Sequence, residues 1–114
     1  MSFTPDQLAQ QQLDAYNARD LERFLSYFAP EVEIFDQPTG ERTLHGRDAM
    51  RERYGSFFAT NTALHCALLN RITEGNFAID HEHVTGLADG RELHAVAIYE
   101  TNGEHIVKVW FIRR

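Results

Sequence analysis

The sequence predicts an α+β domain in which three helices come before a mostly antiparallel sheet. Three observations predict this class. Apolar residues recur at helical spacing through most of the first 60 positions, and from Leu64 onward they recur at every second position. Three glycine-containing turns, EGN, ADGR and TNGE, separate the later segments and are typical of hairpins. The resulting order, ααβαββββ, favours helices packed on one face of the sheet.

The first helix begins with a capping box. Thr4 can accept a backbone N–H and Gln7 can reach back to Thr4, while Pro5 suits the first helical position. One arc of this helix is apolar and comprises Leu8, Ala9, Leu13 and Tyr16. Gln12 falls in the middle of that arc. A polar side chain within a buried stripe needs a hydrogen-bond partner, so Gln12 is a candidate cavity residue.

The next three elements are shorter. Asp20 can cap a second helix, which Pro30 ends, and residues 32–36 form a short strand that leads into the turn-rich QPTGE. A third helix follows Gly46 and turns a set of large side chains inward: Met50, Tyr54, Phe57 and Phe58.

Four strands follow, at about 64–73, 76–86, 92–101 and 105–112. Centring each turn on its glycine divides their side chains into two rows. The first row contains Asn70, His81 and His83 with many apolar residues, among them Cys66, Leu68, Val109 and Phe111. The second row contains Arg71, Asp80, Glu82 and Lys108 with Ala95, Ala97, Tyr99, Ile106 and Trp110.

Burial favours the first row facing the helices. Turning the second row inward would bury four charged side chains, and each buried charge costs several kcal/mol to desolvate even when paired. A ligand cavity could reverse this choice, because charges and small residues such as Ala95 are found inside cavities. The expected outer row mixes aromatic residues with opposite charges, which predicts a homodimer through the outer face of the sheet.

Composition limits the function. The chain of 114 residues fits one domain, 1–114, and its net charge of −6 argues against nucleic acid. Cys66 is the single cysteine and cannot close an intrachain disulfide, which favours a reducing compartment. Its place in an apolar row indicates a packing role. The start of the chain shows no signal peptide, and no apolar run approaches the roughly 20 residues of a membrane span. We therefore expect a cytoplasmic protein.

The run YNARDLERFLSYFAPEVEIFDQPTGERTLHGRDAMRERY, residues 16–54, resembles the nuclear transport factor 2-like superfamily. Its members include ketosteroid isomerases, SnoaL-like polyketide cyclases and scytalone dehydratase. The resemblance covers nearly the whole chain. It implies a cone-shaped α+β barrel that is usually dimeric, with a pocket between helices and sheet. Because this superfamily contains many chemistries, the resemblance indicates the fold more strongly than the activity.

The resemblance also implies roles for individual residues. Asp36 matches the general base of ketosteroid isomerases, and Tyr54 matches a tyrosine that supports their oxyanion hole. Gln12 stands where their main oxyanion-hole tyrosine is expected, and their second donor falls near Ala97 or Val96. Losing one donor costs about 100- to 1,000-fold in rate, so steroid isomerisation is not expected. Asp36 could alternatively accept backbone hydrogen bonds in its turn.

His81 and His83 raise the question of a metal. Gly75 to His83 reproduces the opening of a cupin motif, but Leu87 and Ala88 stand where the cupin glutamate should follow. Two histidines without a third ligand are a weak signal, so no metal and no cofactor is expected. We interpret His81 instead as an acid–base partner of Asp36.

Two functions remain open. In the first, Asp36 and His81 transfer protons in an isomerase, cyclase, dehydratase or hydrolase. In the second, the same fold binds a ligand or presents a dimer surface without chemistry. Either way the expected ligand is a small apolar or semi-polar organic molecule. The expected pocket residues are Gln12, Tyr16, Tyr54, Phe58, Asn70 and His83.

Overall fold

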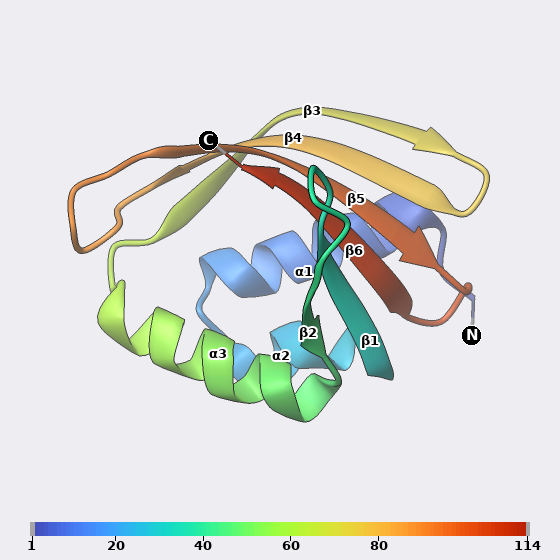
Figure 1. The fold of residues 1–114 in the computed structure, drawn as a ribbon, viewed down its shortest axis with the longest axis horizontal. Helices are drawn as coiled ribbons and strands as arrows, with labels where there is room; N and C mark the ends of the chain where they lie inside the picture. Colours follow the sequence, from blue (N-terminus) through green and yellow to red (C-terminus); the bar gives the residue numbers. More distant parts are fainter. Residues whose placement is uncertain (1, 114) are drawn as a thin grey trace.

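Three helices lie under a curved, mostly antiparallel sheet, as the sequence predicts; the sheet has six strands, one more than predicted, because Arg42–His45 also forms a strand. The computed structural model describes residues 2–113 (Figure 1). The elements are α1 Pro5–Asn17, α2 Leu21–Ser26, β1 Phe28–Asp36, β2 Arg42–His45, α3 Arg47–Thr60, β3 His65–Glu74, β4 Phe77–Thr85, β5 Leu93–Thr101 and β6 Ile106–Arg113. The strand order is β2-β1-β6-β5-β4-β3, and every pairing is antiparallel except that of β1 with β6. The sheet stays open and curves over the helices (Figure 1).

The N-terminal caps form where the sequence places them. The Thr4 N–H donates to Gln7 Oε1 at 2.9 Å, and the Gln7 N–H donates to Thr4 Oγ1 at 3.4 Å. Asp20 Oδ1 accepts the Arg23 N–H at the start of α2. These local bonds satisfy orphan N–H groups and fix where both helices begin.

The second helix ends earlier than predicted. α2 stops at Ser26 and β1 already begins at Phe28, so Pro30 lies in a strand. The pairing of β1 with β6 shifts register between Phe28 and Glu33, which spans Pro30. Proline has no N–H for the sheet ladder and is tolerated at such irregularities. None of the helices within residues 2–113 is long and apolar enough to span a membrane.

The prediction for the two faces of the sheet is wrong. Asp80 is fully buried and Glu82 is 6% exposed, whereas His81 and Asn70 are exposed to solvent. The row that carries the acids therefore faces the helices. The desolvation cost that argued against burying these two acids is reduced in different ways. Asp80 forms a buried ion pair, and Glu82 faces a cavity, both described below.

Two register shifts explain the error. In the pairing of β3 with β4, Asn70 lies opposite His81 but Leu68 lies opposite Glu82, because the register slips between them. A residue gained in one strand turns the following side chains to the other face. Cys66 and Leu68 therefore lie on the helix-facing side, beside Glu82, rather than in the histidine row.

The second shift lies between β5 and β6, at Glu100 and Thr101. Beyond it, Tyr99 pairs with Val109 and Ala97 pairs with Phe111. Val109 and Phe111 thus join the inner face, where Val109 is 1% exposed. With both shifts, the inner face gains the apolar residues that a regular register assigns to the outside.

Candidate active site

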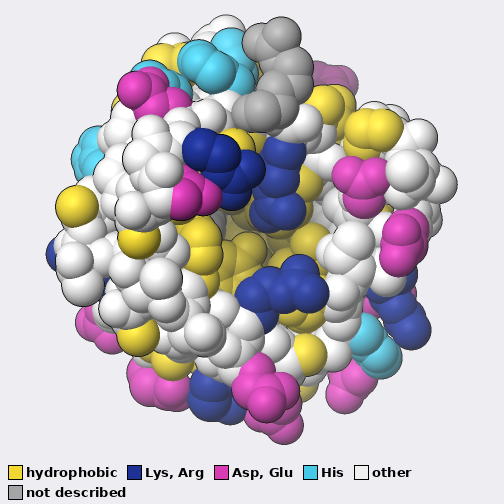
Figure 2. All heavy atoms as spheres, turned by 60° about the vertical axis from the view of Figure 1, so that its left-hand side comes forward, with side chains coloured by type: hydrophobic (Ala, Val, Ile, Leu, Met, Phe, Trp, Pro, Cys, Tyr) yellow, Lys and Arg dark blue, Asp and Glu magenta, His cyan; other side chains and the backbone are white. Residues whose placement is uncertain are grey.

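A cavity of about 250 Å³ lies between the helices and the concave side of the sheet. Figure 2 shows its opening as a hollow lined by hydrophobic side chains, with basic side chains at the rim. The lining residues are Gln12, Leu13, Tyr16, Phe24, Phe28, Ile34, Met50, Arg53, Tyr54, Phe57, Cys66, Glu82, Val84, Leu93, Ala95, Tyr99, Val109, Phe111 and Arg113. An apolar cavity of 150 Å³ already accepts benzene, so this space suits a ligand of one or two rings.

Glu82 on β4 is the one carboxyl group on this wall within the described part of the chain. Burial raises the pKa of its carboxyl to about 7, and the negative charge of Asp80 adds to the rise. The neighbouring Cys66 thiol lowers this pKa, as do the positive charges of Arg71 and Arg113. Glu82 therefore exchanges its proton near neutral pH, where a general acid or base works best.

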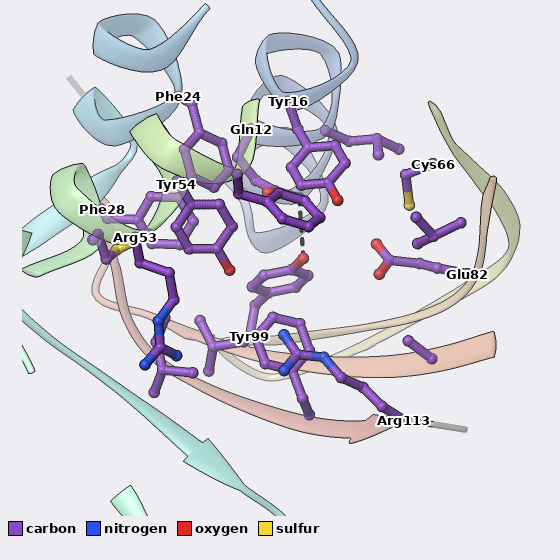
Figure 3. A pocket seen from close by; sticks show the side chains of 18 of the residues that line it. Gln12, Tyr16, Phe24, Phe28, Arg53, Tyr54, Cys66, Glu82, Tyr99 and Arg113 are labelled. Atoms are coloured by element: carbon purple, nitrogen blue, oxygen red, sulfur yellow. Dashed lines mark hydrogen bonds between the residues drawn. The ribbon is translucent and has the colours of Figure 1, made fainter. Parts of the chain in front are cut away.

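The thiol beside Glu82 stays protonated. Cys66 on β3 points toward the Glu82 carboxyl (Figure 3), and burial raises the pKa of the thiol well above its usual range. The carboxylate of Glu82 raises it further. A neutral thiol is a weak nucleophile and a weak hydrogen-bond donor. Cys66 thus supports the carboxylate form of Glu82 and is unsuited to attack a ligand itself.

Behind Glu82 lies a buried ion pair. Arg71 Nε and Nη2 donate to the two carboxylate oxygens of Asp80 at 2.6 and 2.9 Å. Arg71 Nη1 also donates to Gln10 Oε1 at 3.1 Å, which ties β3 to α1. A bidentate guanidinium satisfies both oxygens and offsets the cost of burying the charge. The pair lies next to the site, because Asp80 is two residues from Glu82 on β4.

Gln12 and Tyr99 form a hydrogen-bonded pair on the wall. Gln12 Nε2 donates to the Ala9 carbonyl at 2.9 Å and to the Tyr99 hydroxyl at 3.1 Å (Figure 3). This is the partner that a polar residue in the apolar stripe of α1 requires. The Tyr99 hydroxyl accepts in this bond, so its own proton remains available to another acceptor.

Two further hydroxyls line the cavity. Burial is the main reason that the pKa of Tyr16 and the pKa of Tyr54 are raised above the usual tyrosine value. Burial raises the pKa of Tyr99 as well. All three rings therefore carry neutral O–H donors at physiological pH. Phe58 is buried behind the wall, with its ring edge-on to Tyr16 at a centroid distance of 5.4 Å.

Asp36, the expected general base, does not reach the cavity. It ends β1, and its Oδ2 accepts from the Thr39 hydroxyl at 2.7 Å and from the Thr39 N–H at 3.3 Å. The backbone N–H of Asp36 donates to the Glu41 carbonyl, which closes the same turn. The alternative interpretation, an aspartate that stabilises the QPTGE turn, describes this environment.

The expected histidines also lie elsewhere. His81 and Asn70 are exposed on the outer face of the sheet, so the structure does not bring His81 to Asp36 as a couple. His83 stacks on His94 with 4.6 Å between ring centroids, and its Nε2 lies 2.6 Å from Glu92 Oε1. Their assignment to the cavity followed from the inverted sheet faces and is wrong for the same reason.

Of the residues expected around the pocket, Gln12, Tyr16 and Tyr54 lie on the cavity wall. The sequence argument missed Glu82, Cys66, Tyr99, Arg53 and Arg113. One signal was present: the alternation that places Glu82 in a row with Ala95 and Ala97. Small residues opposite an acid leave room for a ligand, whereas a packed face fills that room with large side chains.

The sequence profile of the SnoaL-like domain family matches residues 9–109. No functionally curated protein matches the chain significantly. Among solved structures, the chain is similar to an uncharacterised cystatin-fold protein from Novosphingobium aromaticivorans, with a TM-score of 0.87 and 24% identity over 96% of this chain and 98% of that one. A protein provisionally named a ketosteroid isomerase, from Kribbella flavida, has a TM-score of 0.80 and 21% identity over 95% and 76% of the two chains.

A third similar structure is that of an NTF2-like protein of unknown function from Cytophaga hutchinsonii. Its TM-score is 0.82 at 10% identity, over 100% of this chain and 93% of the other. At these identities the three structures show a shared fold. They carry no activity across to this chain.

Proposed function

This chain belongs to the SnoaL-like domain family, and we propose that it is a cofactor-independent enzyme that moves a proton on a small organic molecule. The observation that carries the proposal is Glu82, a carboxyl group with a pKa of about 7 on an otherwise largely apolar wall. Glu82 replaces Asp36 in the role of general base. Proton removal followed by return at another atom underlies isomerisation, cyclisation and dehydration alike.

Neutral hydroxyls supply the complementary part of the chemistry. When Glu82 removes a proton next to a carbonyl group, negative charge develops on the carbonyl oxygen. The O–H groups of Tyr16, Tyr54 and Tyr99 are donors that can stabilise that charge in a site of low polarity. We do not propose the steroid isomerase reaction. Gln12 stands where the main oxyanion-hole donor of ketosteroid isomerases is expected, and its amide N–H groups donate to Ala9 and Tyr99 instead of facing a ligand.

Cavity size narrows the substrate. The volume of about 250 Å³ is smaller than the roughly 300–1,000 Å³ of typical drug-sized sites. One or two rings fit this space better than a four-ring steroid. The apolar lining favours a largely hydrocarbon body with one polar group near Glu82.

Hydrogen–deuterium exchange tests the proposal without a known substrate. Small cyclic ketones and aryl ketones are incubated with the protein in D₂O, and NMR follows loss of the proton next to the carbonyl. We expect Glu82→Gln to slow the catalysed exchange at least about 100-fold, the usual contribution of a general base. Asp36→Asn is the matched control and should exchange at the wild-type rate, because the Asp36 carboxylate accepts its hydrogen bonds from Thr39 in the turn, away from the cavity.

Equal exchange by the wild type and Glu82→Gln would refute the catalytic assignment. The second candidate function, ligand binding without chemistry, is favoured by one observation: Gln12 uses its amide group within the protein. That function is indicated if a compound binds the cavity tightly and the wild type exchanges no proton of any ketone tested.

The outer face of the sheet supports a proposed homodimer. A continuous apolar row crosses five strands on this face, with neighbours paired in register: Phe35, Trp110, Ile98, Ile79 and Ile72. Phe35 and Trp110 stack with 5.6 Å between centroids, and Ile72 is 58% exposed. Contiguous apolar surface of this kind marks interaction sites.

Light scattering tests the dimer. The wild type should have twice the monomer mass at tens of micromolar, and Trp110→Glu should be monomeric. His65→Glu, an exposed change at the far end of β3, is the control and should leave the mass unchanged. A monomeric wild type contradicts the proposal.

A further inference from the structure

We propose that the cavity binds an organic anion, a hydrophobic molecule with a single carboxylate that is held at the rim by Arg53 and Arg113. The inference rests on the proposed function only in placing the rest of the ligand beside Glu82. Binding itself requires no chemistry. The argument rests on where the two guanidinium groups lie, on their partners and on the charge of the wall.

Two arginines from distant parts of the chain meet at the opening. Arg53 comes from α3 and Arg113 from the end of β6, and both line the cavity. Figure 3 shows Arg53 coming from the left of the view and Arg113 from the lower right, with their guanidinium groups turned toward each other, and Figure 2 shows basic groups around the hollow. Burial raises the pKa of Tyr54, and the positive charge of Arg113 acts against that rise, so Arg113 lies near the hydroxyl.

Neither of these arginines has a carboxylate within 4 Å among residues 2–113. Arg53 Nη2 makes one long hydrogen bond, to the Thr43 carbonyl at 3.5 Å. Arg113 lies over the Phe111 ring, with Cζ 4.0 Å from the centroid. Stacking on an aromatic ring orients a guanidinium while its N–H groups stay free for a planar acceptor.

The other arginines of residues 2–113 use their guanidinium groups within the protein. Arg42, Arg51, Arg71 and Arg91 each pair with an aspartate or glutamate. Arg19 and Arg47 donate to backbone carbonyls, and Arg23 donates to the Tyr27 hydroxyl. The chain as a whole carries a net charge of −6, so acids are abundant. Arg53 and Arg113 have no carboxylate partner among residues 2–113. Positive charge is therefore concentrated at the rim of the cavity on an otherwise acidic protein.

The wall as a whole favours an anion. Its charged residues are Arg53, Arg113 and Glu82, so its net charge is positive in either protonation state of Glu82. The buried pair of Arg71 and Asp80 behind it is neutral. A carboxylate matches the fork of donors on a guanidinium, and aromatic and aliphatic side chains inside match an apolar body. A second anionic group would meet no further positive charge on the wall.

Calorimetric titration tests the inference with matched acids and amides. The probes are 2-naphthoate and cinnamate, each compared with its neutral primary amide at constant ionic strength. We expect each acid to bind at least about tenfold more tightly than its amide, because hydrogen bonds to charged groups exceed neutral ones by this order. Added salt should weaken binding of the acids and leave the amides unchanged.

Variants assign the effect to the rim. Arg53→Gln and Arg113→Gln should each weaken acid binding about tenfold, and the double variant should lose the preference for the acid. Arg51→Gln, on the same helix and exposed, is the control and should match the wild type. Unchanged affinity for the amides shows that the cavity remains folded in each variant.

The inference is overturned if neither acid binds more tightly than its amide, whether or not any probe binds. It is also overturned if the double variant keeps the preference or if Arg51→Gln loses it. Glu82→Gln separates this result from the proposed function. If the acids bind the wild type and Glu82→Gln equally well while the wild type exchanges no ketone proton, the anion site is supported and only the catalytic proposal is refuted.

Discussion

Replacing Glu82 by glutamine should change how the stability of the protein depends on pH. The pKa of this carboxyl rises from 4.5 to about 7 on folding, because burial and the charge of Asp80 disfavour the anion. Between these values the folded chain keeps a proton that the unfolded chain has lost. Folding stability therefore falls as pH rises through this window and levels off above pH 7.

The size of the effect follows from the shift. Each pKa unit corresponds to 1.36 kcal/mol, so a rise from 4.5 to about 7 removes about 3 kcal/mol of stability between acidic and slightly alkaline pH. Glutamine is nearly isosteric and does not ionise. Glu82→Gln should thus be about 3 kcal/mol more stable relative to the wild type at pH 8 than at pH 4.

Urea unfolding of both proteins across this range measures the difference directly. Histidines and other acids titrate in both proteins, so they cancel in the comparison. Glu52→Gln, an exposed change on α3, serves as the control and should give a curve parallel to the wild type. If the curve of Glu82→Gln is also parallel, the carboxyl is not desolvated and the reasoning fails.

Two further changes test the contacts around the site. Tyr99→Phe removes the acceptor of the Gln12 amide and should lower the free energy of unfolding by about 1 kcal/mol, measured in urea; no change would mean that this hydrogen bond contributes nothing. Arg71→Met leaves Asp80 buried without its partner and should cost about 3–5 kcal/mol, or prevent folding, in thermal and urea unfolding. Arg91→Met breaks an exposed pair and should change the stability little by comparison, so equal losses from the two arginine changes would contradict the account of the buried pair.

The fold was predictable because its signals are local. The capping box at Thr4, the cap at Asp20 and the glycine turns each depend on residues within four positions of one another. They define where helices begin and where hairpins reverse, and with the change of period they give the order of elements. The resemblance of residues 16–54 then supplied the way these elements pack.

The faces of the sheet were not predictable from the same signals. Each face depends on counting residues along paired strands, and one extra residue reverses every side chain beyond it. The shift near Asn70 has no local marker such as proline or glycine. The shift at Thr101 adjoins the TNGE turn, where the glycine marks the reversal of the chain but not the change of register. The error moved Glu82 outward and His81 inward, and with them the candidate base.

Asp80 and Glu82 are predicted on the outer face because burying a charge is costly. This prediction cannot include the contacts that lower this cost in the folded protein. Asp80 is stabilised by Arg71, nine residues away on the neighbouring strand, with support from Gln10 on α1. Glu82 avoids the full cost because it can hold a proton at neutral pH. Both compensations depend on contacts between strands and helices that exist only once the register is known. Gln12 was recognisable earlier, because a polar residue within an apolar helical arc is visible in the sequence alone.

The most direct test is a ¹³C NMR titration of the Glu82 side-chain carboxyl, assigned by the signal that disappears in Glu82→Gln. The account predicts a midpoint near pH 7. A midpoint near 4.5, the ordinary value of a solvated glutamate, would contradict it.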